Sequence, residues 1–151
     1  MGGLRIYDQA TLNAASAFAH DGAFWISGIE FDHPSRIFRL LFHLPNTEQI
    51  RYRRILWPVS RRFVPFARWQ LTFRFADECR INVENELNKE SMRFEIASLQ
   101  LNAAGTKVVI STHFVMTIDI SISALSGEID ELPGTSEMPP LCSLVVRSTD
   151  S

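Results

Sequence analysis

Residues 69–75 read Trp-Gln-Leu-Thr-Phe-Arg-Phe, an unbroken alternation of apolar and polar side chains. Successive side chains of a β-strand point to opposite faces of a sheet, so this period of two predicts a half-buried strand. The face that we expect in the core carries Trp69, Leu71, Phe73 and Phe75. A single strand is not stable alone, and the flanking sequence supplies further strands for it to pair with.

Residues 36–44 alternate in the same way. Their core-facing set is Phe38, Leu40 and Phe42. The preceding Asp-His-Pro-Ser at 32–35 favours a turn, because Asp can bond to its own following backbone and proline fixes one torsion. We therefore expect a hairpin whose first strand lies within residues 24–29, where apolar and β-branched residues prevail.

Two further strands are expected at residues 94–101 and 107–122, with a turn at 102–105 between them. In the second strand the predicted core parity is Val108, Ile110, Thr112, Phe114, Met116, Ile118, Ile120 and Ile122. Between residues 50 and 66, Pro58 and Pro65 predict only edge strand and loop, because proline cannot donate to a sheet ladder.

One helix is expected over residues 9–19, where apolar residues recur at helical spacing behind Asp8, a good N-cap. The chain has 151 residues, 46% of them hydrophobic, which suits a globular domain. The predicted fold class is α+β, mostly antiparallel β, with one short N-terminal helix followed by a meander-like sheet, a sandwich or a partly open barrel. We expect a single β-rich domain over residues 1–132.

Residues 133–151 contain several prolines, serines and threonines, which predicts a loose C-terminal tail with at most one short edge strand at 141–146. The N-terminus lacks a basic region followed by an apolar run, and no segment approaches the roughly 20 apolar residues of a membrane span. We therefore expect a cytoplasmic protein without membrane contact. Cys79 and Cys142 form no metal-type pair, and two reduced thiols are expected.

Motifs that announce catalysis are missing from the sequence: it has no glycine-rich phosphate loop, no GxSxG and no HExxH. No catalytic residue, metal ligand or cofactor is predicted. The polar candidates are His20, Asp21, His43 and His113. For the adjacent pair His20-Asp21, a turn in which Asp21 accepts backbone amides is favoured over a ligand pair. An enzyme in which these four residues and Asp119 converge in space ranks third among the functions considered.

Charge is segregated along the chain, because residues 36–74 contain nine arginines and only one acid, Glu48. Guanidinium groups interleaved with aromatic rings are typical of surfaces that bind anions or planar groups. The predicted partner-binding residues are Arg51, Arg53, Arg54, Trp57, Arg61, Arg62 and Arg68. The alternative is that the arginines form ion pairs across the fold with Glu84, Glu86, Glu128, Asp130 and Glu131.

The run His20-Asp21-Gly22-Ala23, followed by Ile26, Ile29, Phe31-Asp32, Arg36 and the apolar strand 38–44, resembles the opening of small bacterial β-rich domains. In that group, which includes immunity proteins of polymorphic toxin systems and domains of unknown function, a His-Asp-small turn begins a β-hairpin. The resemblance extends to residues 71–73 and 118–122. It implies a β-rich fold without catalytic machinery that acts by covering a partner's surface, and it assigns no functional residues. The arginine-rich middle departs from the acidic character of nuclease inhibitors, so a nuclease target is not favoured.

Two functions follow from these patterns. The first is a protein-binding module without catalytic activity, of immunity type, that neutralises a partner through its Arg and aromatic surface. The alternative is nucleic-acid binding through residues 36–74, with arginines on phosphates and Tyr52, Trp57 or Trp69 stacked on bases. The sequence pI of about 6.1 is well below the values typical of dedicated nucleic-acid domains, which ranks this function second.

Overall fold

The computed structural model describes the backbone of residues 3–46, 51–56, 59–84, 90–138 and 144–146, and the side chains of 3–46, 65–84 and 90–134. This part of the chain contains one α-helix, α1 (Gln9–Ala19), a 3-10 turn, η1 (Ile26–Gly28), and ten strands. The strands are β1 (Leu4–Ile6), β2 (Ala23–Phe24), β3 (Ile29–Asp32), β4 (Ile37–Pro45), β5 (Arg51–Leu56), β6 (Val59–Val83), β7 (Phe94–Leu101), β8 (Lys107–Thr112), β9 (Met116–Met138) and β10 (Leu144–Val146).

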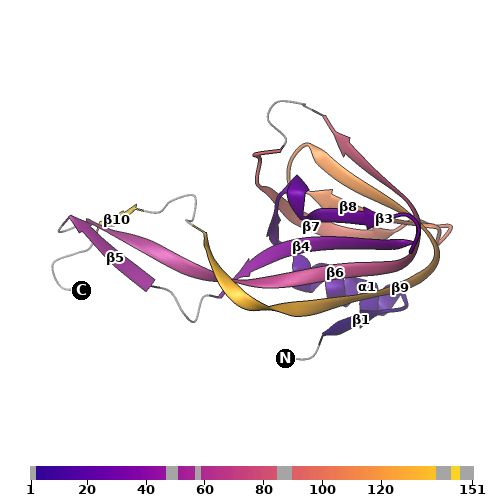
Figure 1. The fold of residues 1–151 in the computed structure, drawn as a ribbon, viewed down its shortest axis with the longest axis horizontal. Helices are drawn as coiled ribbons and strands as arrows, with labels where there is room; N and C mark the ends of the chain where they lie inside the picture. The colour runs from indigo at the N-terminus through magenta and orange to yellow at the C-terminus, as the bar shows by residue number, and fades with distance from the viewer. Residues whose placement is uncertain (1–2, 47–50, 57–58, 85–89, 139–143, 147–151) are drawn as a thin grey trace.

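All of these strands belong to one antiparallel sheet of order β1-β9-β8-β7-β2-β4-β6-β10, with β3 added to β4 and β5 added to β6. The long strands β6 and β9 also pair with each other, so the sheet curls partly into a ring (Figure 1). The α+β class with a mostly antiparallel sheet, predicted from the sequence, is confirmed. In the described residues no helix has the length and apolarity needed to cross a membrane.

Helix α1 begins where the sequence predicts it. The Asp8 carboxylate accepts the Thr11 amide at 2.8 Å, and the Thr11 hydroxyl accepts the Asp8 amide at 3.0 Å, which is a reciprocal capping box. The helix packs on β7 and β1. Its buried face carries Leu12, Ala15 and Ala19, and the hydroxyl of Ser16 accepts the Leu99 amide at 2.9 Å. The predicted helix is therefore confirmed, with both of its bounds.

The core lies along the inward faces of β4, β6, β8 and β9. The buried residues that alternation predicts are Phe38, Leu40, Phe42, Trp69, Leu71, Phe73, Val108, Ile110, Met116, Ile118, Ile120 and Ile122. The core prediction is wrong for two aromatic residues. Phe75 is 45% exposed because a bulge interrupts β6 beside it, and Phe114 is 77% exposed because the predicted strand 107–122 is divided there. The chain turns back at residues 113–115, so this segment forms the hairpin β8–β9.

The strand predicted within residues 24–29 is also interrupted. It splits into β2 and β3, because η1 turns the chain between them. The hairpin over the 32–35 turn is confirmed, since β3 pairs with β4 from Asp32↔Ile37 onward. The predicted turn at 102–105 is confirmed as well, with the Asn102 side chain accepting the amides of Thr106 and Lys107 at 2.8 and 3.0 Å.

The prediction that proline breaks the chain before residue 66 is wrong at Pro65, which lies inside the continuous strand β6. The Pro65 carbonyl accepts the Asn46 amide at 2.8 Å, just past the last β4 pair, Pro45↔Phe66. In a hydrogen-bonded antiparallel pair, the same two residues exchange both bonds. The N–H that Pro65 lacks would therefore point to Asn46 as well. Only one bond at the end of β4 is therefore lost.

Residues 133–138, which the sequence places in a loose tail, continue β9 and pair with β6 as far as Val64↔Met138. The short strand β10 occupies Leu144–Val146, within the segment where an edge strand is predicted, and it pairs with β6 opposite residues 59–61. Residues 139–143 and 147–151 lie outside the described part of the chain.

Candidate functional site

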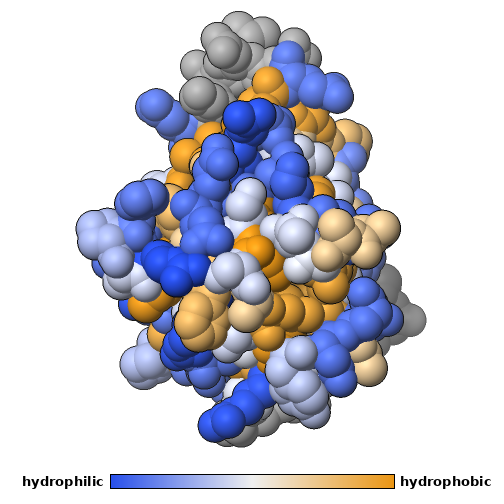
Figure 2. Space-filling view, turned by 90° about the vertical axis from the view of Figure 1, so that its right-hand side faces the viewer, coloured by the Kyte–Doolittle hydropathy of each residue, from blue (hydrophilic) through white to orange (hydrophobic). Residues whose placement is uncertain are grey.

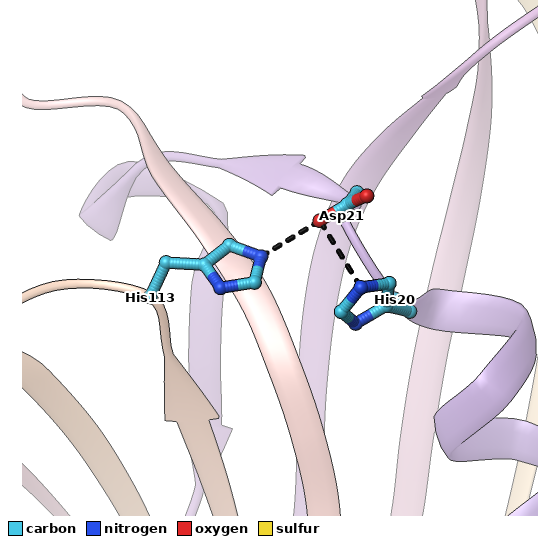
Figure 3. Close-up of side chains that lie close together, drawn as sticks. All are labelled: His20, Asp21 and His113. Atoms are coloured by element: carbon cyan, nitrogen blue, oxygen red, sulfur yellow. Dashed lines mark hydrogen bonds and ion pairs between the residues drawn. The ribbon is translucent and has the colours of Figure 1, made fainter.

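Three of the four polar candidates meet on one side of the sheet. His20 follows the last residue of α1, Asp21 comes next in the chain, and His113 lies in the turn between β8 and β9. Both imidazoles approach the Asp21 carboxylate (Figure 3): His113 Nε2 lies 2.7 Å and His20 Nε2 lies 3.4 Å from the same oxygen, Oδ1. The two rings face each other edge to face with centroids 5.3 Å apart. We call these three residues the His-Asp-His cluster.

Three consecutive carbonyls of β7 hold the cluster in place. Glu95 O accepts the His113 amide at 3.1 Å, Ile96 O accepts the Asp21 amide at 2.8 Å, and Ala97 O is bonded to the His20 ring at 3.0 Å. The register between β7 and β8 shifts at this place, from Ile96↔Thr112 to Ser98↔Ser111, which leaves Ala97 as the extra residue of a β-bulge. Bulges redirect backbone groups and are frequent beside functional sites.

The backbone at Asp21 is unusual, with a φ of +66°. This left-handed conformation is uncommon outside glycine, although Asp and Asn adopt it more readily than other residues do. Gly22 follows, and a Cβ there would lie 2.7 Å from Phe42 Cδ2 and 2.9 Å from the Ala19 carbonyl oxygen. The turn therefore leaves no room for a side chain at residue 22. It fixes Asp21 where its carboxylate meets His113.

His43, the fourth polar candidate, lies outside this cluster. It sits on β4 with 8% of its surface exposed, and its ring meets Trp25 edge to face at 5.8 Å. Burial, followed by the positive charges of Arg68 and Arg93, lowers the pKa of the His43 imidazole below its ordinary value of 6.5. Asp119, the remaining residue of the enzyme hypothesis, is on β9 and accepts the Asn82 side chain at 3.2 Å. The convergence of all five residues is therefore wrong.

The lowered pKa of His43 makes stability depend on pH. The unfolded chain binds a proton at His43 more readily than the native protein does, so His43 should lower the free energy of unfolding as pH drops below about 6.5 and should contribute no change above it. Denaturant unfolding of the wild type and of His43→Asn at about pH 7.5 and about pH 5.5 measures this. We expect the variant to lose less stability on acidification. An equal loss in both proteins would assign the pH dependence to other groups.

Among the described side chains, the His-Asp-His cluster is the group that could hold a metal ion. One ligand atom from each residue lies within 4.8 Å of the others. Sequence analysis identified His20, Asp21 and His113 separately but not their meeting, because 92 residues separate Asp21 from His113. No local spacing could signal it. The turn expected at His20-Asp21 is present. The sequence predicts that the Asp21 carboxylate accepts backbone amides, but it meets the imidazole of His113.

A cleft of about 730 Å³ opens at the β8–β9 turn. Thr112 and Val115, which flank His113 and Phe114 in the chain, line it together with the last three residues of β6, 81–83, and with Glu84 after them. The Thr112 hydroxyl lies 2.7 Å from the carbonyl oxygens of both Phe114 and Met116, so its one hydrogen is donated to either or shared between them, which holds the turn. Figure 2 shows apolar side chains gathered among hydrophilic ones on one face of the molecule.

Cys79 is the one thiol among the described side chains, and it is half-buried. Burial, followed by the negative charge of Asp119, raises the pKa of the Cys79 thiol to about 11. It is therefore protonated at neutral pH, and a protonated thiol is a poor nucleophile and metal ligand.

The arginines of residues 36–74 fall into two groups. Those on the curved body of the sheet pair with acids: Arg36 with Asp77 at 2.7 Å, Arg39 with Glu30 at 3.6 Å, and Arg74 with Glu128. Arg74 thus follows the ion-pair alternative with one of its predicted partners. Arg68 also belongs to the body, where it is half-buried and lies opposite His43 in the register.

The second group lies on a projecting ribbon formed by β5, residues 59–64 of β6, and β10 (Figure 1). It extends beyond the last pair between β4 and β6, Pro45↔Phe66. The ribbon contains the remaining predicted partner-binding arginines, which are Arg51, Arg53, Arg54, Arg61 and Arg62. Their side chains, and Trp57 as a whole, lie outside the described part of the structure.

Comparison of the chain with protein-family models, with curated proteins and with solved structures returned no match.

Proposed function

We propose that the protein is a binding module whose projecting ribbon docks on an acidic surface of a protein partner. The observation that carries this proposal is the concentration of unbalanced positive charge on that ribbon. Residues 51–56, 59–64 and 144–146 contain five arginines and no acid. Three of the body arginines, Arg36, Arg39 and Arg74, pair with neighbouring carboxylates.

The register of the ribbon increases the charge density. Arg53 lies opposite Arg61, and Tyr52 lies opposite Arg62. Like charges directly opposite each other in an antiparallel pair are destabilising, and the cost is relieved when an anionic partner binds. Guanidinium is also weakly hydrated compared with ammonium and matches carboxylates with two parallel hydrogen bonds. The ribbon thus combines an internal electrostatic cost with the side-chain type suited to relieve it on a carboxylate-rich surface.

A protein partner is favoured over nucleic acid by the charge of the whole molecule. The net charge is −2, and exposed acids such as Asp130 and Glu131 lie on β9, the strand that pairs with β6 next to the ribbon. A polyanion longer than the ribbon would meet these carboxylates. A protein surface with mixed charge can place cations there, which gives electrostatic complementarity on both sides.

The test starts with capture of partners on the immobilised full chain, with and without nuclease, at low and high salt. The captured partner is then titrated against the wild type and against the double variant Arg53→Glu/Arg54→Glu. We expect the double variant to bind at least about tenfold more weakly, since reversing charge at a docking surface introduces repulsion. The matched control is Arg80→Glu, an arginine that is 70% exposed on the body.

Equal affinity of the double variant and the wild type would remove the ribbon from the binding surface. Capture that disappears with nuclease, or that falls steeply with salt and yields nucleic acid, would replace this proposal by the nucleic-acid alternative.

A further inference from the structure

We propose that His20, Asp21 and His113 bind one divalent transition-metal ion, with zinc as the ion that best fits the donor set. Two imidazole nitrogens and one carboxylate oxygen are common ligands of zinc in proteins. They come from the end of α1 and from the β8–β9 turn, and the three ligand atoms lie within 4.8 Å of one another. This site is separate from the projecting ribbon and does not depend on the function proposed for it.

The hydrogen bond of His20 determines which of its nitrogens can bind metal. His20 Nδ1 lies 3.0 Å from the carbonyl oxygen of Ala97. A carbonyl only accepts, so Nδ1 carries the hydrogen, and Nε2 of the neutral ring has a free electron pair. A metal-bound histidine usually donates its other N–H to a carbonyl or carboxylate in this way. The β7 bulge at Ala97 therefore supplies the outer contact that a histidine ligand requires.

The distance between His20 Nε2 and Asp21 Oδ1 supports a cation between them. Both atoms are acceptors when His20 is neutral, and they lie 3.4 Å apart. That is longer than an ordinary N–H···O hydrogen bond of about 2.7 to 3.2 Å. Two ligands about 2.0 to 2.2 Å from a tetrahedral zinc ion are separated by about 3.4 Å. The spacing thus suits a shared metal ion better than a shared proton.

His113 completes the site after a small movement. Its Nε2 lies 2.7 Å from Asp21 Oδ1, which is a hydrogen bond in the metal-free protein. On metal binding at Nε2 the proton moves through solvent to Nδ1, so the neutral ring becomes a ligand and no proton is lost overall. The two atoms must separate by about 0.7 Å to reach the spacing of two zinc ligands, and the His113 side chain lies at the surface in the β8–β9 turn, 29% exposed.

The side chains of the cluster are accessible to solvent, which indicates an open metal site. The side chains of His20, Asp21 and His113 are 51%, 61% and 29% exposed. Three protein ligands on an accessible surface leave a coordination position for water or for a group of a bound molecule, as in zinc sites that are not purely structural. The bonds to β7 position the backbone of Asp21 and His113 and hold the His20 ring before any ion arrives, which lowers the ordering cost of binding.

The experiment uses the metal alone and the full chain. Zinc chloride is titrated into the metal-free protein by calorimetry, and cobalt(II) is added in parallel to record the visible absorption of a four-coordinate site. We expect one ion per chain, and a melting temperature that rises with zinc, because an ion that binds the native state stabilises it. The variants are His20→Asn, Asp21→Asn and His113→Asn. Asn at residue 21 keeps the left-handed backbone accessible.

Each of the three variants should bind zinc at least about tenfold more weakly, because even the loss of an outer contact costs that much. The matched control is His33→Asn, a histidine exposed in the β3–β4 turn, which should bind like the wild type. Two results would overturn the proposal: no saturable zinc binding by the wild type, or binding that the three variants leave unchanged. In the first case the three side chains only contact one another, and in the second the ion binds elsewhere on the chain.

Discussion

Replacing Phe73 by alanine is expected to lower the free energy of unfolding by about 3 to 5 kcal/mol. Phe73 is fully buried on β6, its ring lies 6.5 Å from that of Phe38 on the neighbouring strand β4, and its edge covers Gly127 on β9. Truncation removes the transfer energy of the ring and leaves a cavity between strands that are held together by backbone pairing. Urea unfolding followed by circular dichroism measures the loss.

The matched control is Phe75→Ala, two residues further along the same strand. Alternation places both rings on one face, yet Phe75 is 45% exposed and lies over the Arg36 guanidinium at 5.8 Å. Removal of an exposed ring with one cation–π contact should cost about 1 kcal/mol or less. Equal losses of unfolding free energy for the two variants would show that Phe75 is buried in the core and that β6 has no bulge at this residue.

The bulge explains why the sequence predicts Phe73 correctly and Phe75 wrongly. The β6–β9 register shifts between Arg74 and Ala76, and Phe75 adopts a φ of +57°. One extra residue reverses the parity beyond it, so that Ala76 is fully buried in its place. Nothing in a Trp-Gln-Leu-Thr-Phe-Arg-Phe alternation marks the residue at which a strand bends. The bend is set by pairing with β9, more than 40 residues away.

Elements decided by local chemistry are predicted well. The capping box at Asp8 and the helical spacing after it define α1, and the β7 strand at 94–101 has the bounds that the sequence predicts. The curvature of the sheet and the meeting of α1 with the β8–β9 turn are long-range features. His113 falls on the non-core parity of a predicted strand, and only the turn at residues 113–115 brings it to Asp21.

The concentration of arginines in residues 36–74 is visible in the sequence, but their division into two groups is not. The acids that neutralise Arg36 and Arg39 are Asp77 and Glu30, neither of which sequence analysis named. Glu30 faces Arg39 because the β3–β4 hairpin sets that register, and Asp77 follows the bulge in β6. Which acid each of these arginines meets therefore depends on pairing geometry, which composition does not reveal.

The second large effect is expected at Gly127, which pairs with Ile6 of β1 on one side and Phe73 of β6 on the other. A Cβ at this residue would lie 2.7 Å from the Thr72 carbonyl oxygen and 2.8 Å from Cδ1 of the Phe73 ring. Gly127→Ala must therefore displace backbone as well as a side chain, and we expect it to lower the free energy of unfolding by about 1 to 3 kcal/mol. The neighbouring change Ser126→Ala, at a half-buried position, should stay within about 0.5 kcal/mol.

A double-mutant cycle separates the two contacts at Gly127. In the Phe73→Ala background the ring is gone and the Thr72 carbonyl remains, so Gly127→Ala should cost less there than in the wild type. The expected coupling is about 0.5 to 3 kcal/mol, measured from the four urea unfolding curves. Additive losses would show that the ring does not cover Gly127. In that case the cost of a side chain at residue 127 would come from the contact with the Thr72 carbonyl alone.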